Sequence, residues 1–273
     1  MTMNNPFNQQ SPIPDIKKII VVSSGKGGVG KSTIATNLAL SLGQKYKVGL
    51  LDADIYGPSL PRLMGTLNQK PNINADGKIE PIQRYGLKLM SIGYLINEAS
   101  AVVWRGPMLF KAIDQFLRDV KWAPLDVLVI DLPPGTGDIQ LSLAQKVPLA
   151  GAIIVSTPQN IAFMDAKKSI DMFERVQVPI LGLVENMSYM INPSTGDRMQ
   201  LYPKGELDQF IESKNISKLG EIPFNPSISL SCEAGVPIVE SNSKGIEAIS
   251  FSHIAEKIAL KLFSEENAAA PTL

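Results

Sequence analysis

The chain has 273 residues, of which 44% are apolar and 19% are charged, as expected for a globular protein with a large core. Lysine plus arginine and aspartate plus glutamate each number 26, so no overall basic charge is available to bind nucleic acid or an anionic membrane. The apolar runs are strand-sized, no signal-peptide core begins the chain, and the single cysteine cannot form an intrachain disulfide, which together predict a cytoplasmic protein without membrane binding.

The predicted elements begin after a polar, proline-containing segment, residues 1–15, which we expect to be a flexible tail. Short β-branched apolar runs predict buried strands, and apolar residues at helical spacing predict the helices. The predicted strands are Lys18–Val22, Val48–Leu51, Leu87–Ile92, Val127–Ile130, Ala152–Val155, Ile180–Val184 and, more weakly, Lys218–Ile222. The predicted helices are Ser32–Leu42, Pro107–Val120, Ala162–Val176 and Ile246–Phe263.

This alternation of apolar strands with helices predicts an α/β fold class, with a mostly parallel sheet covered by helices on both faces. No internal repeat or low-complexity linker divides the chain, so we expect one domain over residues 16–265 and a C-terminal tail over residues 266–273. Two segments, Gly65–Gln83 and Tyr189–Lys204, are predicted to be rich in loops.

A glycine-rich segment joins the first predicted strand to the first predicted helix. It reads Gly25-Lys-Gly-Gly-Val-Gly-Lys-Ser32 and matches the phosphate-binding pattern G-x-x-x-x-G-K-[ST] in the context that the pattern requires. Glycines let backbone N–H groups turn inward around phosphate oxygens, and the helix N-terminus adds the positive end of its dipole. Lys31 would pair with the β- and γ-phosphates, and the Ser32 hydroxyl would ligate Mg²⁺. The predicted nucleotide-binding residues here are Gly25, Lys26, Gly27, Gly28, Val29, Gly30, Lys31, Ser32 and Thr33.

Carboxylates follow the second predicted strand. Asp52 and Asp54 lie two residues apart, so their side chains point to the same face at the strand's carboxyl end, where open α/β sheets bind ligands. A carboxylate there can hold the water shell of Mg²⁺ or orient an attacking water. The alternative for both residues is an acidic cap at a strand–loop junction.

Asp131 ends the apolar strand Val127–Ile130, and beside a phosphate loop we interpret it as the Walker B aspartate near Mg²⁺. Gly135 is free to present its N–H to a γ-phosphate, which makes this segment a predicted switch that senses hydrolysis. We expect Asp138 to cap the helix that follows. Asn186 follows another predicted strand, and its amide offers a donor and an acceptor to an adenine edge; the alternative is a turn residue.

Lys26 narrows the class of phosphate loop. The pattern K-G-G-x-G-K-[ST] resembles the deviant loop of the SIMIBI-class dimeric ATPases, including nitrogenase iron protein, septum-site and plasmid-partition ATPases and Mrp-type proteins. In those families the extra lysine reaches across a homodimer to the partner's phosphates, and the resemblance implies this role for Lys26. A mobile cation in trans stabilises charge as an arginine finger does. The alternative is a solvated loop lysine.

Further segments resemble the Mrp (ApbC-type) P-loop ATPases, which are described as iron–sulfur cluster carriers. They are Asp52–Ser59, Trp104–Met108, Asp131–Asp138, Ser156–Gln159 and Glu185–Tyr189, and the resemblance covers roughly residues 16–263. It implies a homodimeric ATPase that uses ATP and Mg²⁺ and assists the transfer of iron–sulfur clusters to client proteins. It also implies that Asp54 positions the catalytic water, that Asp52 lies near Mg²⁺ and that Asn186 contacts adenine. Pro223 would lie in the loop that lines the base.

One segment departs from this family. Members typically carry C-x-x-C just after the position of Tyr189, and here the two cysteine positions fall on Asn192 and Thr195. Iron–sulfur clusters are held mainly by cysteine thiolates, and a dimer normally pools two such pairs. Cys232, the single cysteine, is expected to be a small buried apolar residue. The sequence therefore predicts an ATPase without the usual cluster site.

An alternative function is a positioning or regulatory ATPase like the septum-site and partition proteins, which often end in a basic membrane-binding helix. The last predicted helix ends with only two lysines over Ile254–Phe263 before an acidic segment, which predicts weak membrane attraction. A reductase like nitrogenase iron protein would require cluster cysteines. His253 is expected to be structural, and Trp104 and Trp122 are expected to pack in the core.

Overall fold

The computed structural model describes residues 10–95, 106–203 and 205–268 of the chain. The strands are β1 (Ile16–Ser23), β2 (Val48–Asp52), β3 (Ile82–Arg84), β4 (Leu87–Ser91), β5 (Leu125–Asp131), β6 (Gly151–Ser156), β7 (Ile180–Glu185), β8 (Met190–Ile191), β9 (Arg198–Met199) and β10 (Lys218–Glu221). The α-helices are α1 (Lys31–Gly43), α2 (Leu60–Leu63), α3 (Gly106–Asp119), α4 (Asp138–Lys146), α5 (Asn160–Arg175), α6 (Leu207–Ser213), α7 (Pro226–Glu233), α8 (Ile238–Ser241) and α9 (Ile246–Ala268).

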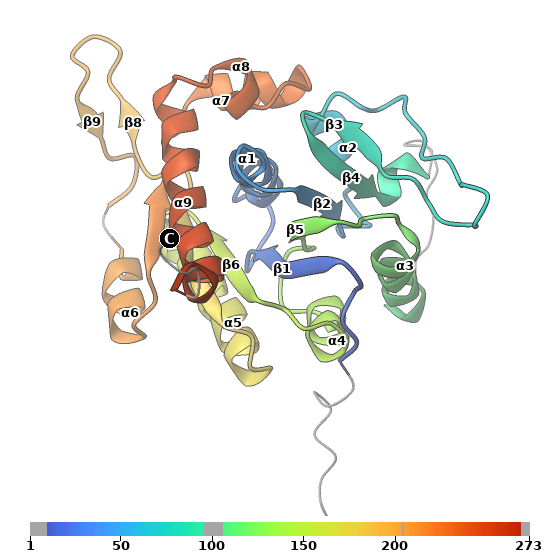
Figure 1. The fold of residues 1–273 in the computed structure, drawn as a ribbon. Coiled ribbons are helices and arrows are strands. Elements are labelled where there is room, and N and C mark those ends of the chain that lie inside the picture. Colours follow the sequence, from blue (N-terminus) through green and yellow to red (C-terminus); the bar gives the residue numbers. More distant parts are fainter. Residues whose placement is uncertain (1–9, 96–105, 204, 269–273) are drawn as a thin grey trace, which may run out of the picture.

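The larger sheet has eight strands in the order β10-β7-β6-β1-β5-β2-β4-β3. Every pair in it is parallel except β3 with β4. In Figure 1, α1 and α9 lie on one side of this sheet, and α3, α4 and α5 lie on the other. The predicted fold class, a mostly parallel sheet between helices, is therefore confirmed.

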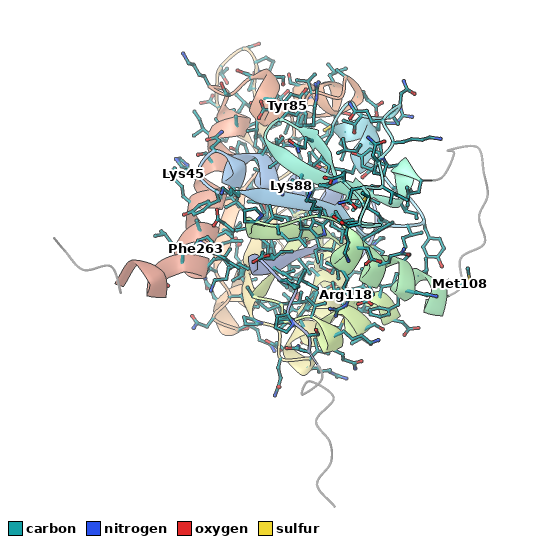
Figure 2. All side chains as sticks on the ribbon, turned by 45° about the vertical axis from the view of Figure 1, so that its right-hand side comes forward. Lys45, Tyr85, Lys88, Met108, Arg118 and Phe263 are labelled. Atoms are coloured by element: carbon teal, nitrogen blue, oxygen red, sulfur yellow. The ribbon has the colours of Figure 1, made fainter. Side chains whose placement is uncertain are left out.

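The central strands are apolar along their whole length because helices cover both faces of the sheet. Ile20 and Val21 of β1 and Val129 of β5 are fully buried although their side chains alternate between the two faces. At the outer flank, Tyr46 of the segment that follows α1 stacks on Phe263 of α9, with ring centroids 4.9 Å apart. Figure 2 shows Lys45 and Phe263 on this flank.

Lys88 ties the outer part of the sheet to the segment before β5. Its Nζ donates to the carbonyls of Trp122 and Ala123, at 2.7 Å each. Trp122 is itself 2% exposed and donates its indole N–H to the carbonyl of Phe116 on α3. The expected packing role of Trp122 is confirmed, whereas Trp104 lies outside the described residues.

Several boundaries differ from expectation. The end of the predicted N-terminal tail is packed rather than free, because Ile13 is buried and Ser11 donates its N–H to the carbonyl of Lys146. The predicted loop Tyr189–Lys204 contains the β8–β9 hairpin, and β3 begins inside the predicted loop Gly65–Gln83. These strands have only two or three residues, which is too short for an apolar period to reveal them.

The strand register aligns polar residues along one edge of the sheet. Asp52 at the end of β2 lies beside Asp131 of β5 on one side and Ser91 of β4 on the other. Ser156 of β6 lies beside Glu185 of β7 in the same way. Each of these residues is the last of its strand, so polar groups lie side by side at the carboxyl edge of an otherwise apolar sheet.

Candidate nucleotide-binding site

The phosphate loop connects β1 to α1 at this carboxyl edge. Gly28 and Gly30 both have φ near +83°, a conformation that L side chains rarely adopt, and Gly30 is the N-cap of α1. A Cβ at Gly27 or Gly28 would meet nothing within 4 Å, so the loop faces open space there. The loop therefore forms an open, backbone-lined turn at a helix N-terminus, which is the geometry that binds phosphate.

Close neighbours leave no room for a side chain at Gly25 or at Gly30. A Cβ on Gly25 would collide with the backbone of Asp165 on α5, and a Cβ on Gly30 would collide with the amide of Asn186. The Asn186 amide also donates from Nδ2 to the carbonyl of Val29 at 2.9 Å. The loop is therefore wedged between α5 and the segment that follows β7, which fixes its shape before any ligand binds.

Lys31 lies at the base of this loop and forms a buried ion pair. Its Nζ is 2.5 Å from Oδ1 of Asp131 and 3.4 Å from Oγ of Ser32. Lys31 is 6% exposed and Asp131 is 4% exposed, so each charge depends on the other for compensation in a region with little water. The sequence-predicted lysine, serine and Walker B aspartate are thus brought together, although Lys31 and Asp131 lie 100 residues apart.

Asp52 is the most enclosed carboxylate of the site, with 1% exposure. Its Oδ2 accepts hydrogen bonds from the N–H groups of Ser59 and Leu60 and from the Ser91 hydroxyl, at 3.0–3.1 Å. Its Oδ1 accepts from the N–H of Asp54 at 3.1 Å. Asp52 therefore holds the loop between β2 and α2 in place while it lies beside Asp131.

Burial raises the pKa of the Asp52 carboxyl from 3.8 to about 7, with the neighbouring Asp131 charge adding to the effect. Burial also raises the pKa of Asp54, against the lowering effect of Lys31. Asp54 is only half-buried and accepts backbone hydrogen bonds from Gly57 and Tyr56, so its carboxylate stands at the open side of the site.

The raised pKa of Asp52 gives a testable pH dependence. Between pH 3.8 and about 7 the folded chain keeps a proton on Asp52 that the unfolded chain has lost. The free energy of unfolding should therefore fall as the pH rises through this window, by at most about 1.4 kcal/mol per pH unit for one proton. Urea unfolding of the wild type and of Asp52→Asn, without nucleotide, isolates this group because asparagine does not titrate. A wild-type-minus-variant difference that stays flat or rises with pH would show that the Asp52 pKa is not raised.

The loop after β5 contains Gly135, which has φ of +92°. Its N–H donates to the carbonyl of Ser24 in the phosphate loop at 2.8 Å. Asp138 is the first residue of α4, the N-cap is Gly137, and no side chain makes a capping hydrogen bond there. The expected cap at Asp138 is therefore wrong, although its charge still favours the positive end of the helix dipole.

Asn186 and Pro223 lie in loops that are held side by side. Asn186 is 6% exposed and donates its backbone N–H to the carbonyl of Ser156 at 2.8 Å. Pro223 is buried directly after β10, where the N–H of Ser188 donates to the carbonyl of Ile222 at 3.0 Å. Asn186 contacts the phosphate loop through the carbonyl of Val29.

Sequence reasoning missed a charged cluster beside Asn186. Nζ of Lys218 lies 3.0 Å from Glu185, 3.1 Å from Asp208 and 2.7 Å from Glu221. Burial alone would lower the pKa of Lys218, but the hydrogen bonds that its ammonium group donates to Glu221 and Glu185 hold the pKa above its usual value. The cluster borders a cavity of about 380 Å³ under the β8–β9 hairpin. Only the strand-end position of Glu185 could have indicated it.

The tip of the β8–β9 hairpin contains the two positions where the family resemblance leads one to expect cysteines. Oδ1 of Asn192 accepts from the N–H of Ser194 at 2.9 Å, and Oγ1 of Thr195 accepts from the N–H of Asp197 at 3.3 Å. The backbone carbonyl of Asn192 also accepts from Gly196 at 2.8 Å. Both side chains therefore close the turn by hydrogen bonding and supply no soft metal ligand.

Cys232 lies elsewhere, on α7. It is 8% exposed, and its thiol approaches the Thr33 hydroxyl of α1 at 3.9 Å. Burial raises the pKa of this thiol, which disfavours the thiolate that a metal needs. His253, in contrast, is exposed on α9. The expected buried state of Cys232 is confirmed.

The oxygen ligands of the site suit Mg²⁺. A hydroxyl, Ser32, and the carboxylates Asp52, Asp54 and Asp131 are hard donors, which is the class of ligand that Mg²⁺ prefers. Across the described ranges no three His, Cys, Asp or Glu side chains converge closely enough to hold a metal on their own. This arrangement fits an ion that keeps several waters and is shared with substrate phosphates.

The fold and the phosphate loop define a P-loop nucleoside triphosphatase. A family model described as ParA, NUBPL iron-transfer P-loop NTPase, matches residues 15–259, and the chain belongs to this family. None of the helices in the described parts of the chain is both long and apolar enough to cross a membrane.

Curated relatives agree with this membership. The chain is 46% identical over 264 residues to the iron-sulfur cluster carrier protein of Aquifex aeolicus, covering 96% of this chain and 72% of that protein. It is 47% identical over 255 residues to the protein of the same name in Escherichia coli K12, covering 93% and 69%. The iron-sulfur cluster transfer protein NUBPL of Mus musculus is 43% identical over 265 residues, covering 96% and 83%.

Solved structures extend the comparison. A nucleotide-binding protein in complex with ADP from Archaeoglobus fulgidus has a TM-score of 0.72 and 38% identity, over 84% of this chain and 90% of that one. The septum site-determining protein MinD complexed with Mg-ADP from Pyrococcus horikoshii has a TM-score of 0.63 over 89% and 96%. At 21% identity, the latter shows the fold alone. The expected family is therefore confirmed, while the roles of individual site residues stay predictions.

Proposed function

We propose that this protein is a Mg²⁺-dependent ATPase that acts as a homodimeric switch in the transfer of iron–sulfur clusters to client proteins. The observation that carries the proposal is the buried Lys31–Asp131 pair beneath an open phosphate loop. Relatives at 43–47% identity are named for cluster carriage or transfer, which supports the choice of cargo.

The phosphate chain of ATP would lie along the loop from Gly25 to Thr33, over the open face at Gly27 and Gly28. Lys31 is paired with Asp131, so phosphate oxygens compete with one carboxylate for its ammonium group. Mg²⁺ on the Ser32 hydroxyl, with Asp131 and Asp52 near its water shell, would neutralise charge on the β- and γ-phosphates. Asp54, which is half-buried, would orient the attacking water.

The Asn186 amide supports adenine rather than guanine as the base. Its Nδ2 donates to the carbonyl of Val29, which fixes the amide orientation and leaves Oδ1 as the group available to a ligand. An acceptor matches the 6-amino group of adenine and opposes the 6-oxo group of guanine. Pro223 would line the base from the loop after β10.

We therefore expect ATP to bind more tightly than GTP, and Asn186→Leu to remove most of this preference. Loss of one hydrogen bond and relief of one mismatch each correspond to about tenfold in affinity. The measurement is competition of ATP and GTP for a fluorescent ADP analogue, with melting temperature as the control for the lost Val29 contact. Unchanged ATP:GTP selectivity in a folded variant would exclude Asn186 as the base-reading residue.

Lys26 is the predicted trans-acting cation. Lys26 is half-buried on the loop and has no carboxylate partner among the residues that the structure describes. A lysine without a carboxylate partner among these described residues can pair with phosphates bound to a second copy, and removing it leaves Lys31 to bind the nucleotide.

We expect Lys26→Ala to bind ATP normally, to lose ATP-driven dimerisation and to hydrolyse ATP up to about 10³-fold more slowly. Lys45→Ala is the matched control, because Lys45 is an exposed lysine at the other end of α1. Steady-state hydrolysis and light scattering with and without ATP give the two readouts. If Lys26→Ala hydrolyses ATP and dimerises as the wild type does, the trans-lysine mechanism is wrong.

Mixing two inactive variants provides a direct test of action across the dimer. A Lys26→Ala chain retains its phosphate loop lysine, and a Lys31→Ala chain retains its trans lysine. Partial recovery of hydrolysis on mixing requires that Lys26 of one chain serve the nucleotide on the other.

A further inference from the structure

Gln140 lies in the first turn of α4 and its side chain points back over the loop that follows β5. Side chains of a helix lean toward its N-terminus, so a residue at this position covers the preceding loop. Nε2 of Gln140 donates to the carbonyl of Pro133 at 2.8 Å and to the carbonyl of Gly135 at 3.1 Å. Gln140 is 1% exposed, and its hydrogen bond to the Pro133 carbonyl is buried while that to the Gly135 carbonyl is partly buried.

The same amide has an unused acceptor. Oε1 of Gln140 is buried and has no hydrogen-bond partner in the structure. A flipped amide would set this oxygen against the carbonyls of Pro133 and Gly135, so the orientation is fixed by its neighbours. A buried unpaired acceptor is costly, and it lies beside the loop, since a Cβ on Gly137 would sit 3.5 Å from it.

The loop that Gln140 clamps is the one that touches the phosphate loop. Gly135 donates its N–H to the carbonyl of Ser24, while its own carbonyl accepts from Gln140. Gly135 is therefore held from two sides, at its N–H by Ser24, which directly precedes the phosphate loop, and at its carbonyl by Gln140 of α4. Any movement of its N–H toward a phosphate must break the contact with Ser24, while Gln140 holds the peptide unit that follows.

We propose that Gln140 is the positioning residue of the Gly135 loop, an inference that rests on the proposed ATPase function. Its Nε2 holds the loop in the position in which the Gly135 N–H donates to the Ser24 carbonyl. Its unpaired Oε1 accepts a backbone N–H of residues 135–137 once a γ-phosphate draws Gly135 away from Ser24. One side chain thereby supports both positions of the loop and makes the exchange between them depend on the γ-phosphate.

The test compares Gln140→Glu, which keeps the shape and Oε1 but replaces the donor, with Gln140→Leu, which keeps the volume but no polar group. Leu143→Ala is the matched control, because Leu143 is fully buried on α4 and makes no contact of this kind with the loop. Melting temperatures identify variants that fail to fold, and Gln140→Glu serves if Gln140→Leu does not fold.

The first readout is hydrogen exchange of the Gly135 amide, followed by NMR in protein without nucleotide. We expect exchange to be about tenfold faster in both Gln140 variants and unchanged relative to global stability in Leu143→Ala. The second readout is the ratio of ADP to ATP-analogue dissociation constants. We expect this ratio to fall about fivefold in Gln140→Leu and not in Gln140→Glu, which keeps the acceptor, with ADP affinity retained in both because ADP does not reach the Gly135 loop.

Wild-type exchange rates at Gly135 in both Gln140 variants would overturn the inference. So would an equal loss of ATP:ADP discrimination in Leu143→Ala, because general loosening of α4 would then explain it. A wild type that binds neither nucleotide would refute the proposed function alone, since the exchange experiment needs no nucleotide and still decides whether Gln140 holds the loop.

Discussion

Lys31→Ala is expected to reduce ATP hydrolysis by at least about 10²-fold, the scale of losing one preorganised group that stabilises developing charge. Nζ of Lys31 is the buried cation at the base of the phosphate loop, 2.5 Å from Asp131. No other lysine or arginine among the described residues lies within ion-pair distance of Asp131, so no other cation can take the place of Lys31. The measurement is steady-state hydrolysis together with ATP binding by calorimetry.

The same substitution carries a stability cost that must be separated from catalysis. Removing Lys31 leaves Asp131, 4% exposed, as an uncompensated buried charge, which typically costs about 3–5 kcal/mol. Lys31→Ala with Asp131→Asn removes that charge and should regain most of the stability while remaining inactive. A folded Lys31→Ala protein that hydrolyses ATP within tenfold of the wild type would contradict the assignment of Lys31.

Placing two cysteines in the β8–β9 hairpin is expected to create an iron–sulfur cluster site there. Asn192 and Thr195 occupy the two positions, and both side chains only close the turn. After anaerobic reconstitution with iron and sulfide, the wild type should remain colourless. Asn192→Cys with Thr195→Cys should bind about one cluster per dimer, because two chains then supply four thiolates. Iron and sulfide analysis and the visible spectrum measure the outcome.

Two controls sharpen this experiment. Asn192→Ser with Thr195→Ser changes the same positions without adding thiolates and should stay colourless. Adding Cys232→Ser to the two-cysteine variant should leave its cluster content unchanged, because Cys232 is buried against Thr33 on a different helix. Stoichiometric cluster in the reconstituted wild type would show that this chain binds clusters at residues outside the hairpin.

In the natural chain, the proposed role in cluster transfer then falls to the nucleotide-driven switch. The wild type would act on clusters held by its partners rather than by its own thiolates. Comparing cluster delivery from a donor to an apoprotein in the presence of wild type or Lys26→Ala tests this role, because only the former is expected to cycle with ATP.

The sequence predicts the centre of the fold well because the central strands are buried on both faces. Val127–Ile130 and Ala152–Val155 are continuous apolar runs, and these two predicted strands lie within the observed strands β5 and β6. The phosphate loop is equally visible, since Gly28 and Gly30 are needed for positive φ and give the motif its spacing. A backbone conformation that requires glycine can therefore be predicted directly from the residue type.

Contacts between distant segments cannot be predicted in this way. The pairing of Lys31 with Asp131, the clamp of Gln140 and the Lys218 cluster all depend on strand order and on side-chain direction. A glutamine in the first turn of a helix is an ordinary surface residue until the preceding loop is seen to fold beneath it. The incorrect cap at Asp138 has a different origin, because the helix begins one residue earlier than expected and Gly137 takes the cap position.

The hairpin also bears on the conditions under which the chain can mature. Its tip is closed by Asn192, Thr195 and backbone hydrogen bonds, all of which form from the polypeptide alone. Segments that fold around a metal wait for that metal, and their folding free energy comes from binding it. Because these bonds need no metal, we expect the hairpin to reach its final shape during folding without iron.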